Sequence, residues 1–168
     1  MADLVRIVPY DPAWPDEFEA EKTRLERVLA PWLAGEIHHV GSTSVPGLGA
    51  KPVIDILAEV RSLEESRAAI EPLQELSYCW APYKAELMNW FCKPSPDHRT
   101  HHLHLVVPGS QAWHEELAFR DALRSDPATA HAYEELKRRL ADEHTLDREA
   151  YTVAKTEFVE AVLARTLN

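Results

Sequence analysis

The sequence predicts an α+β domain whose strands lie in the first two-thirds of the chain and whose last third is helical. Up to about residue 107, short apolar and β-branched segments alternate with turn residues, which is typical of strands. After Pro108-Gly109-Ser110, apolar residues recur at helical spacing only. The 168 residues are enough for one domain with its own core. We therefore expect a single domain over residues 1–168, with a mixed α/β part over 1–109 and a helical layer over 110–168.

Turn and cap residues divide the chain into its elements. Asp11-Pro12 and Asp126-Pro127 each place a helix cap before a proline that fits the first helical turn. Ser62-Leu-Glu-Glu65 is a capping box, in which the serine bonds into the first turn and the glutamate reaches back. The expected strands cover residues 4–8, 36–40, 52–60, 77–80, 86–92 and 100–107. The expected helices cover about 11–31, 62–76, 113–123, 126–141 and 147–163.

The charge balance restricts the partners of the chain. It has 28 acidic and 18 basic residues, a formal charge of −10, and therefore repels nucleic acid and anionic membranes at long range. We expect no nucleic-acid or membrane partner, although a local basic pocket for a nucleotide is compatible with this total. The start of the chain lacks a signal-peptide core, and no apolar run approaches the roughly 20 residues that span a bilayer. Cys79 and Cys92 lack a C-x-x-C spacing and are expected as reduced, buried thiols of a cytoplasmic protein.

The most informative segment runs from His38 to Leu57. A strand leads into Gly41-Ser42, where glycine lets the backbone approach a phosphate and nearby N–H groups and hydroxyls act as donors. The candidate phosphate-binding residues of this loop are Gly41, Ser42, Thr43 and Ser44. The alternative is a tight turn whose hydroxyls cap the backbone.

Asp55 follows inside an otherwise apolar strand. A buried carboxylate is costly unless it is paired, hydrogen-bonded or bound to a cation. Metal-dependent nucleotidyl transfer needs such a carboxylate, because the cation holds the triphosphate oxygens and neutralises developing charge. The alternative is an aspartate that bonds to a loop. The loop and Asp55 together predict a site for phosphate and a divalent metal.

His102 and His104 lie on one face of the last expected strand, with Leu103 and Leu105 on the other. Two imidazoles near Asp55 suit Zn²⁺, Mn²⁺ or Fe²⁺ better than Mg²⁺. They are equally suited to act as a general base and a phosphate ligand, or simply to bond to backbone and carboxylates in a polar crevice. His38 and His39 point in opposite directions, so at most one of them joins this site.

Lys51, Lys93 and Arg99 are the basic residues nearest to these strands and are candidate phosphate ligands. Arg99 is the strongest of the three because it directly precedes the histidines; otherwise the three are surface charges or partners of nearby acids. Three aromatic residues are expected in the core rather than stacked on a base: Trp80, Tyr83 and Trp90. Four residues of the helical part are expected to tie helices together: Arg120, Asp121, Tyr133 and Lys155.

The segment from His39 to Asp55 resembles the signature of the GrpB family of bacterial proteins, which belongs to the nucleotidyltransferase fold superfamily. The resemblance covers nearly the whole chain and extends to Phe91, Lys93, the Arg99–His104 block, Trp113, Phe119-Arg120-Asp121, Tyr133, Tyr151, Lys155 and Phe158. It implies a nucleotidyltransferase-like mixed sheet with flanking helices. A similar domain is fused to dephospho-CoA kinase in some bacteria, which implies a functional link to that enzyme.

The sequence departs from the superfamily at one position. Active members place two acids at alternate positions of this strand, but the partner of Asp55 is Leu57, and Glu59 is roughly 13 Å along the strand. We expect a nucleoside triphosphate or similar anion to bind with Mg²⁺ or Mn²⁺, or Zn²⁺ through the histidines, and a nucleotidyl group to pass to a small acceptor. The alternatives are a catalytically degenerate accessory module and a His/Asp metal-dependent enzyme. The catalytic and metal-binding candidates are Asp55, His102 and His104.

Overall fold

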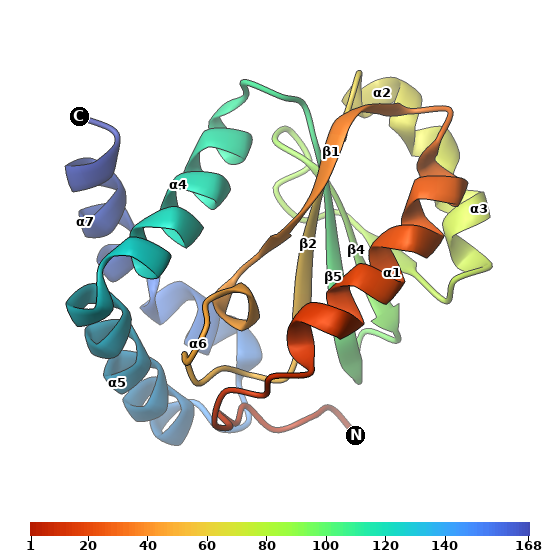
Figure 1. Ribbon diagram of the computed structural model, residues 1–168. Coiled ribbons are helices and arrows are strands. Elements are labelled where there is room, and N and C mark those ends of the chain that lie inside the picture. Colours follow the sequence, from red (N-terminus) through yellow and green to blue (C-terminus); the bar gives the residue numbers. More distant parts are fainter.

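Five strands pair into one mixed sheet in the computed structural model, which describes residues 1–168 (Figure 1). The sheet order is β1-β2-β5-β4-β3, and only β2 and β5 run parallel. The strands are β1 (Leu33–Val40), β2 (Ile54–Val60), β3 (Cys79–Ala81), β4 (Asn89–Pro94) and β5 (Arg99–Val106). The α+β prediction is confirmed. Cys79 and Cys92 are free thiols at paired positions of β3 and β4, the first half-buried and the second buried.

The strand expected over residues 4–8 is wrong. Within it only Val8 forms a bridge, to Ala50. Val5 and Ile7 instead pack against the helices of the C-terminal layer. The apolar alternation is therefore satisfied by burial against helices and not by pairing with another strand.

Two of the three caps predicted from the sequence set where helices begin, but Asp11 does not, because α1 starts at Trp14 with Ala13 at the N-cap and Asp11 only accepts a hydrogen bond from the Ala13 amide. Asp126 accepts hydrogen bonds from the amides of Ala128 and Thr129, and Ser62 accepts one from the amide of Glu65. The helices are α1 (Trp14–Leu29), α2 (Leu63–Ser66), α3 (Ile70–Gln74), α4 (Gln111–Ser125), α5 (Pro127–Glu143), α6 (Arg148–Ala154) and α7 (Thr156–Thr166). Two expected helices are divided, because a 3₁₀ turn separates α2 from α3 and Lys155 separates α6 from α7.

Helices cover both faces of the sheet, with α1, α2 and α3 on one side and α4 to α7 on the other (Figure 1). Strand alternation sends Ile56 and Leu103 into the core beneath α1. The same alternation sends Asp55, His102 and His104 to the opposite face, toward the C-terminal helices. None of the helices combines the length and the apolar character that a membrane crossing requires.

Candidate functional site

Asp55 and His102 form a hydrogen-bonded pair on the sheet face that the C-terminal helices cover. They occupy opposed positions of β2 and β5, and His102 Nδ1 lies 2.9 Å from Asp55 Oδ1. Burial raises the pKa of Asp55, but the hydrogen bond with His102 and the charges of His102, His104 and Lys51 outweigh burial and lower that pKa to about 2. Burial lowers the pKa of His102 by more than Asp55 raises it. At neutral pH the pair is therefore a carboxylate and a neutral imidazole.

His104 forms a second carboxylate–imidazole pair, with Glu116 of α4. Its Nδ1 lies 2.8 Å and 3.0 Å from the two Glu116 oxygens. Burial lowers the pKa of His104, but the charge and hydrogen bond of Glu116 outweigh burial, so the pKa lies above its ordinary value. The two neighbouring histidines thus have pKa values displaced in opposite directions, which suits one as a base and the other as an acid.

Gly41 lies against Asp55 and has no room for a side chain there. Val40 pairs with Asp55 across β1 and β2, so the next residue comes beside the carboxylate. The φ of Gly41 is +72°, and an added Cβ would overlap Asp55 Oδ2. The glycine predicted to let the backbone approach a phosphate therefore also makes space for the Asp55 carboxylate.

The hydroxyls that follow Gly41 divide into two sets. Ser42, at the start of a 3₁₀ turn, lies beside the Tyr133 hydroxyl of α5. The buried Thr43 hydroxyl contacts His39 and donates to a backbone carbonyl, and the Ser44 hydroxyl donates to the Gly41 carbonyl. Thr43 and Ser44 therefore hold the turn, while Gly41 and Ser42 face the C-terminal helices.

Two lysines stack on one buried tyrosine near Asp55. The ammonium groups of Lys51 and Lys155 lie 4.9 Å and 4.5 Å from the centre of the Tyr151 ring. Burial lowers the pKa of Lys51 to about 8 and that of Lys155 to about 7, although the charge of Asp55 raises both. Neither ammonium group has a carboxylate within salt-bridge distance. Two cations on one ring without a bonded carboxylate are groups that could hold an anion.

Sequence reasoning missed several of these helical residues or gave them only a packing role: Glu116, Lys137, Tyr151 and Lys155. Lys137 donates to the Gly49 carbonyl and lies 4.9 Å from the Tyr133 ring centre, so it fixes the loop before β2. The four-residue spacing of Tyr151 and Lys155 could have predicted that the two side chains lie on one side of the helical layer. Nothing in the local pattern shows that this face meets Asp55.

The two remaining basic candidates lie on different faces of the sheet. The register of β4 and β5 is irregular between Arg99 and His101, and the Arg99 guanidinium lies 5.2 Å from the Trp90 ring centre on the Asp55 side. Lys93 lies on the other face, where it pairs with Glu21 of α1 and stacks on Tyr78. Strand alternation thus removes Lys93 from the predicted phosphate site, and the irregular register between Arg99 and His101 leaves Arg99 on the side of that site.

The other two candidate histidines do not reach Asp55. They point to opposite faces of β1, as expected. His38 Nε2 lies 2.8 Å from Glu59 Oε1. His39 stacks on Phe18 of α1 with 4.7 Å between ring centres, and burial lowers its pKa to about 4. Both are occupied by neighbouring side chains.

The aromatic residues expected in the core differ in their exposure. Trp90 is buried, and its ring centre lies 5.1 Å from that of His102. Trp80 and Tyr83 are 40% and 42% exposed, so the core prediction is wrong for these two. Trp80 lies on β3, a short strand at the edge of the sheet, and Tyr83 lies in the loop that follows it.

Three buried side-chain polar atoms lack a hydrogen-bond partner, and all three belong to residues already described: His102 Nε2, His104 Nε2 and the Tyr151 hydroxyl. An unpaired buried group costs about 1–3 kcal/mol, so its presence requires an explanation such as a ligand. We call the set Asp55, His102, His104, Lys51, Tyr151 and Lys155 the Asp55 cluster.

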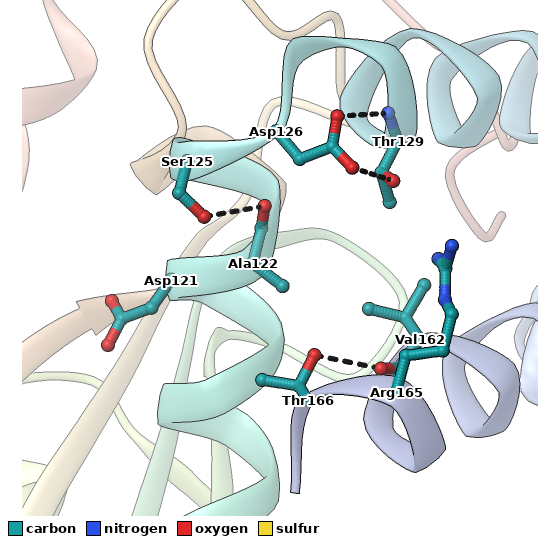
Figure 2. Close-up of a pocket in the computed structure, with 8 residues that line it drawn as sticks. All are labelled: Asp121, Ala122, Ser125, Asp126, Thr129, Val162, Arg165 and Thr166. Carbon is teal, nitrogen blue, oxygen red and sulfur yellow. Dashed lines mark hydrogen bonds between the residues drawn. The ribbon is translucent and has the colours of Figure 1, made fainter.

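A separate hollow of about 440 Å³ lies among α4, α5 and α7 (Figure 2). Three of its polar side chains bond back to their own helices, as the dashed lines in Figure 2 show: Ser125, Asp126 and Thr166. These polar groups serve as helix caps and turns. The hollow therefore lacks the unpaired buried groups of the Asp55 cluster and is not the candidate site.

The donors available to a metal ion are few. No group of three or more His, Cys, Asp or Glu side chains is placed to hold one. The carboxylate pairs engage both imidazole Nδ1 atoms and Asp55 Oδ1, which leaves the two Nε2 atoms and Asp55 Oδ2. Histidines held by carboxylates with Nε2 free are typical metal ligands. A divalent cation here fits only if phosphate oxygens or water complete its coordination.

Comparisons with known proteins agree with this architecture. Residues 4–165 match the GrpB protein family. A UPF0157 protein of Pseudomonas aeruginosa is 43% identical over 170 residues, which cover 98% of this chain and 69% of that protein. A dephospho-CoA kinase of Mycolicibacterium paratuberculosis is 30% identical over 179 residues, which cover 90% of this chain and 43% of that protein. The crystal structure of the conserved protein GrpB from Enterococcus faecalis matches with a TM-score of 0.87 and 32% identity over 96% of this chain and 97% of that one, which confirms the fold class.

Proposed function

This chain belongs to the GrpB family, and we propose that it binds a nucleoside triphosphate with a divalent cation at the Asp55 cluster and transfers a nucleotidyl group to a small acceptor. The observation that carries the proposal is the pair of ammonium groups, of Lys51 and Lys155, that share the Tyr151 ring beside an ionised Asp55. Burying two cations without a bonded carboxylate costs free energy, which an anionic ligand offsets.

Each part of the triphosphate has a complementary group in the site. Lys51 and Lys155 supply positive charge to the phosphate oxygens, and Arg99 offers guanidinium N–H groups. The Gly41-Ser42 backbone leads directly to the Asp55 carboxylate. Asp55 would hold the divalent cation, which would neutralise charge on the phosphates.

The His102–Asp55 pair supplies the base for transfer. An acceptor hydroxyl attacks the α-phosphorus; a P–O bond forms to the acceptor as the P–O bond to the β-phosphate breaks, and pyrophosphate leaves. The acceptor proton passes to His102 Nε2, which is unpartnered. Asp55 holds the other ring nitrogen, Nδ1, and stabilises the imidazolium that forms. His104, whose pKa is raised, donates its Nε2 proton to a phosphate oxygen.

One observation favours a second function, a ligand-binding accessory module without turnover. Leu57, at the position of the second acid, is fully buried, so the strand offers one carboxylate only. The likeness to a dephospho-CoA kinase suggests the enzyme that such a module serves. A third function, a histidine-bound transition-metal enzyme, is favoured by the two free Nε2 atoms. For all three we propose a cytoplasmic location and no nucleic-acid or membrane partner, given the charge of −10.

Thermal unfolding with nucleoside triphosphates, Mg²⁺, Mn²⁺ and Zn²⁺, alone and combined, tests the proposal, because a ligand of the native state raises Tm by mass action. We expect a shift that requires both a triphosphate and Mg²⁺ or Mn²⁺. Lys51→Met should reduce it, and Lys22→Met, on α1 at the other side of the sheet, should not. A shift with Zn²⁺ alone favours the histidine enzyme. Triphosphate binding without pyrophosphate release favours the accessory module, and no triphosphate shift refutes the proposal.

A further inference from the structure

We propose that the half-exposed ring of Tyr83, tilted against Trp90, is the subsite that binds the nucleobase of the triphosphate. This inference rests on the proposed function and extends it from the phosphates to the base. Tyr151 is the only tyrosine of the Asp55 cluster, and its ring is fully buried beneath two lysines, so it offers no face to a base. A base therefore needs another surface.

A continuous series of ring contacts leads from Asp55 to Tyr83. His102, bonded to Asp55, lies 5.1 Å from Trp90 between ring centres. Trp90 lies 5.8 Å from Tyr83, at an interplanar angle of 58°. Tyr83 is thus two rings beyond the imidazole that faces the phosphates. A nucleotide extended along this face places its base at one end and its phosphates at the other.

The loop between β3 and β4 brings Tyr83 to the same face as the histidines. Its neighbour Lys84 lies close enough to His104 for its charge to act against the imidazolium. Tyr83 is 42% exposed although its ring contacts the buried Trp90, so one part of the ring is packed and the rest is open. A half-open aromatic ring of this kind accepts any base, because every base has a π-face.

Arg99 completes the subsite on the side of β5. Its guanidinium lies 5.2 Å from the Trp90 ring centre, and its only hydrogen bond is from Nε to the Pro96 carbonyl, 2.8 Å away. The terminal guanidinium N–H groups are therefore available to oxygens of the ligand. Trp90 is covered by Arg99 and His102, whereas Tyr83 is 42% exposed and has the Lys84 ammonium group 5.5 Å from its ring centre, where it can also contact a phosphate.

The test compares ATP with inorganic tripolyphosphate, each with Mn²⁺, by titration calorimetry. Tripolyphosphate has the phosphates of ATP but no base. Tyr83→Ala should weaken ATP binding by roughly tenfold to a hundredfold and leave tripolyphosphate binding unchanged. Tyr83→Phe should bind ATP as the wild type does. Trp80→Ala is the matched control, because Trp80 is equally exposed but pairs with Phe91, which faces α1.

The outcomes separate the inference from the proposed function. If ATP binds and Tyr83→Ala binds it equally well, the base subsite is refuted and the phosphate site stands. If neither ATP nor tripolyphosphate binds, the proposed function fails; adenosine alone is then titrated while the Trp90 indole N–H is followed by NMR. A Trp90 shift that Tyr83→Ala abolishes supports the subsite, and the absence of any shift overturns it.

Discussion

The Nδ1 atom of His102 and the Oδ1 atom of Asp55 lie 2.9 Å apart because their strands run parallel in a register that places the two residues directly opposite each other. The Asp55 carboxylate is therefore shared with an imidazole, and only its Oδ2 atom is left for another partner. This contact fixes which nitrogen of His102 stays free and keeps Asp55 ionised down to low pH. Sheet pairing, rather than loop geometry, therefore determines the chemistry of the site.

Asp55 is expected to contribute acid-sensitive stability. Its pKa is lowered in the folded state from 3.8 to about 2, so its contribution is present above pH about 4 and is lost as pH falls through about 2. Compared with Asp55→Asn, the wild type should lose about 2 kcal/mol of unfolding free energy over that interval. Urea unfolding at a series of pH values measures the difference. Asp55→Asn should remain folded at pH 7 without metal-dependent triphosphate binding; loss of folding there would show a structural aspartate.

Glu116 is expected to control the charge of His104. Since the folded pKa of His104 is raised, the pair stabilises the protein at low pH and that contribution is lost as pH rises through the folded pKa. Glu116→Gln should therefore destabilise by roughly 1–2 kcal/mol at pH 5.5 and by less at pH 9. Glu115→Gln, on the same helix, is the control and should show no such pH dependence. An NMR titration in which Glu116→Gln leaves the His104 pKa unchanged would contradict the assignment.

The sheet half of the site was predictable from sequence, and the helical half was not. Alternation along β2 and β5 alone places Asp55 with His102 and His104, because successive strand residues face opposite ways. The same rule would have excluded Lys93 from the predicted phosphate site if the register of β4 had been known. Lys155, between α6 and α7, and Glu116 of α4 belong to the helical layer, whose packing on the sheet depends on tertiary contacts that no local pattern encodes. The divided helix at Lys155 was missed for the same reason.

The buried Lys155 ammonium group is expected to lower the unfolding free energy of the protein. Burial lowers its pKa from 10.5 to about 7, so the unfolded chain binds more protons between these values and stability rises with pH across them. Lys155→Met should be more stable than the wild type by about 1–2 kcal/mol at pH 6, and this gain should vanish by pH 10. Chemical unfolding at both pH values checks the sign. A Lys155→Met variant less stable than the wild type at pH 6 would show that the ammonium group has a stabilising partner within the protein.

Gly41 is expected to tolerate no side chain, for two separable reasons. Its φ of +72° is costly for any other residue, and an added Cβ would overlap the Asp55 carboxylate. Gly47, in the same loop, has a φ of +81° but open space around a Cβ. Gly47→Ala should therefore cost only the backbone term, about 1 kcal/mol, and should keep any triphosphate-dependent Tm shift.

Gly41→Ala should cost about 2 kcal/mol more than Gly47→Ala, because Asp55 must move and its hydrogen bond with His102 is lost. The triphosphate-dependent shift should disappear with it. Urea unfolding gives the two free energies, and the NMR signal of His102 reports whether the pair with Asp55 survives. Equal losses of unfolding free energy in the two variants would mean that Asp55 can move without cost. The close contact between Gly41 and the Asp55 carboxylate would then not matter for ligand binding.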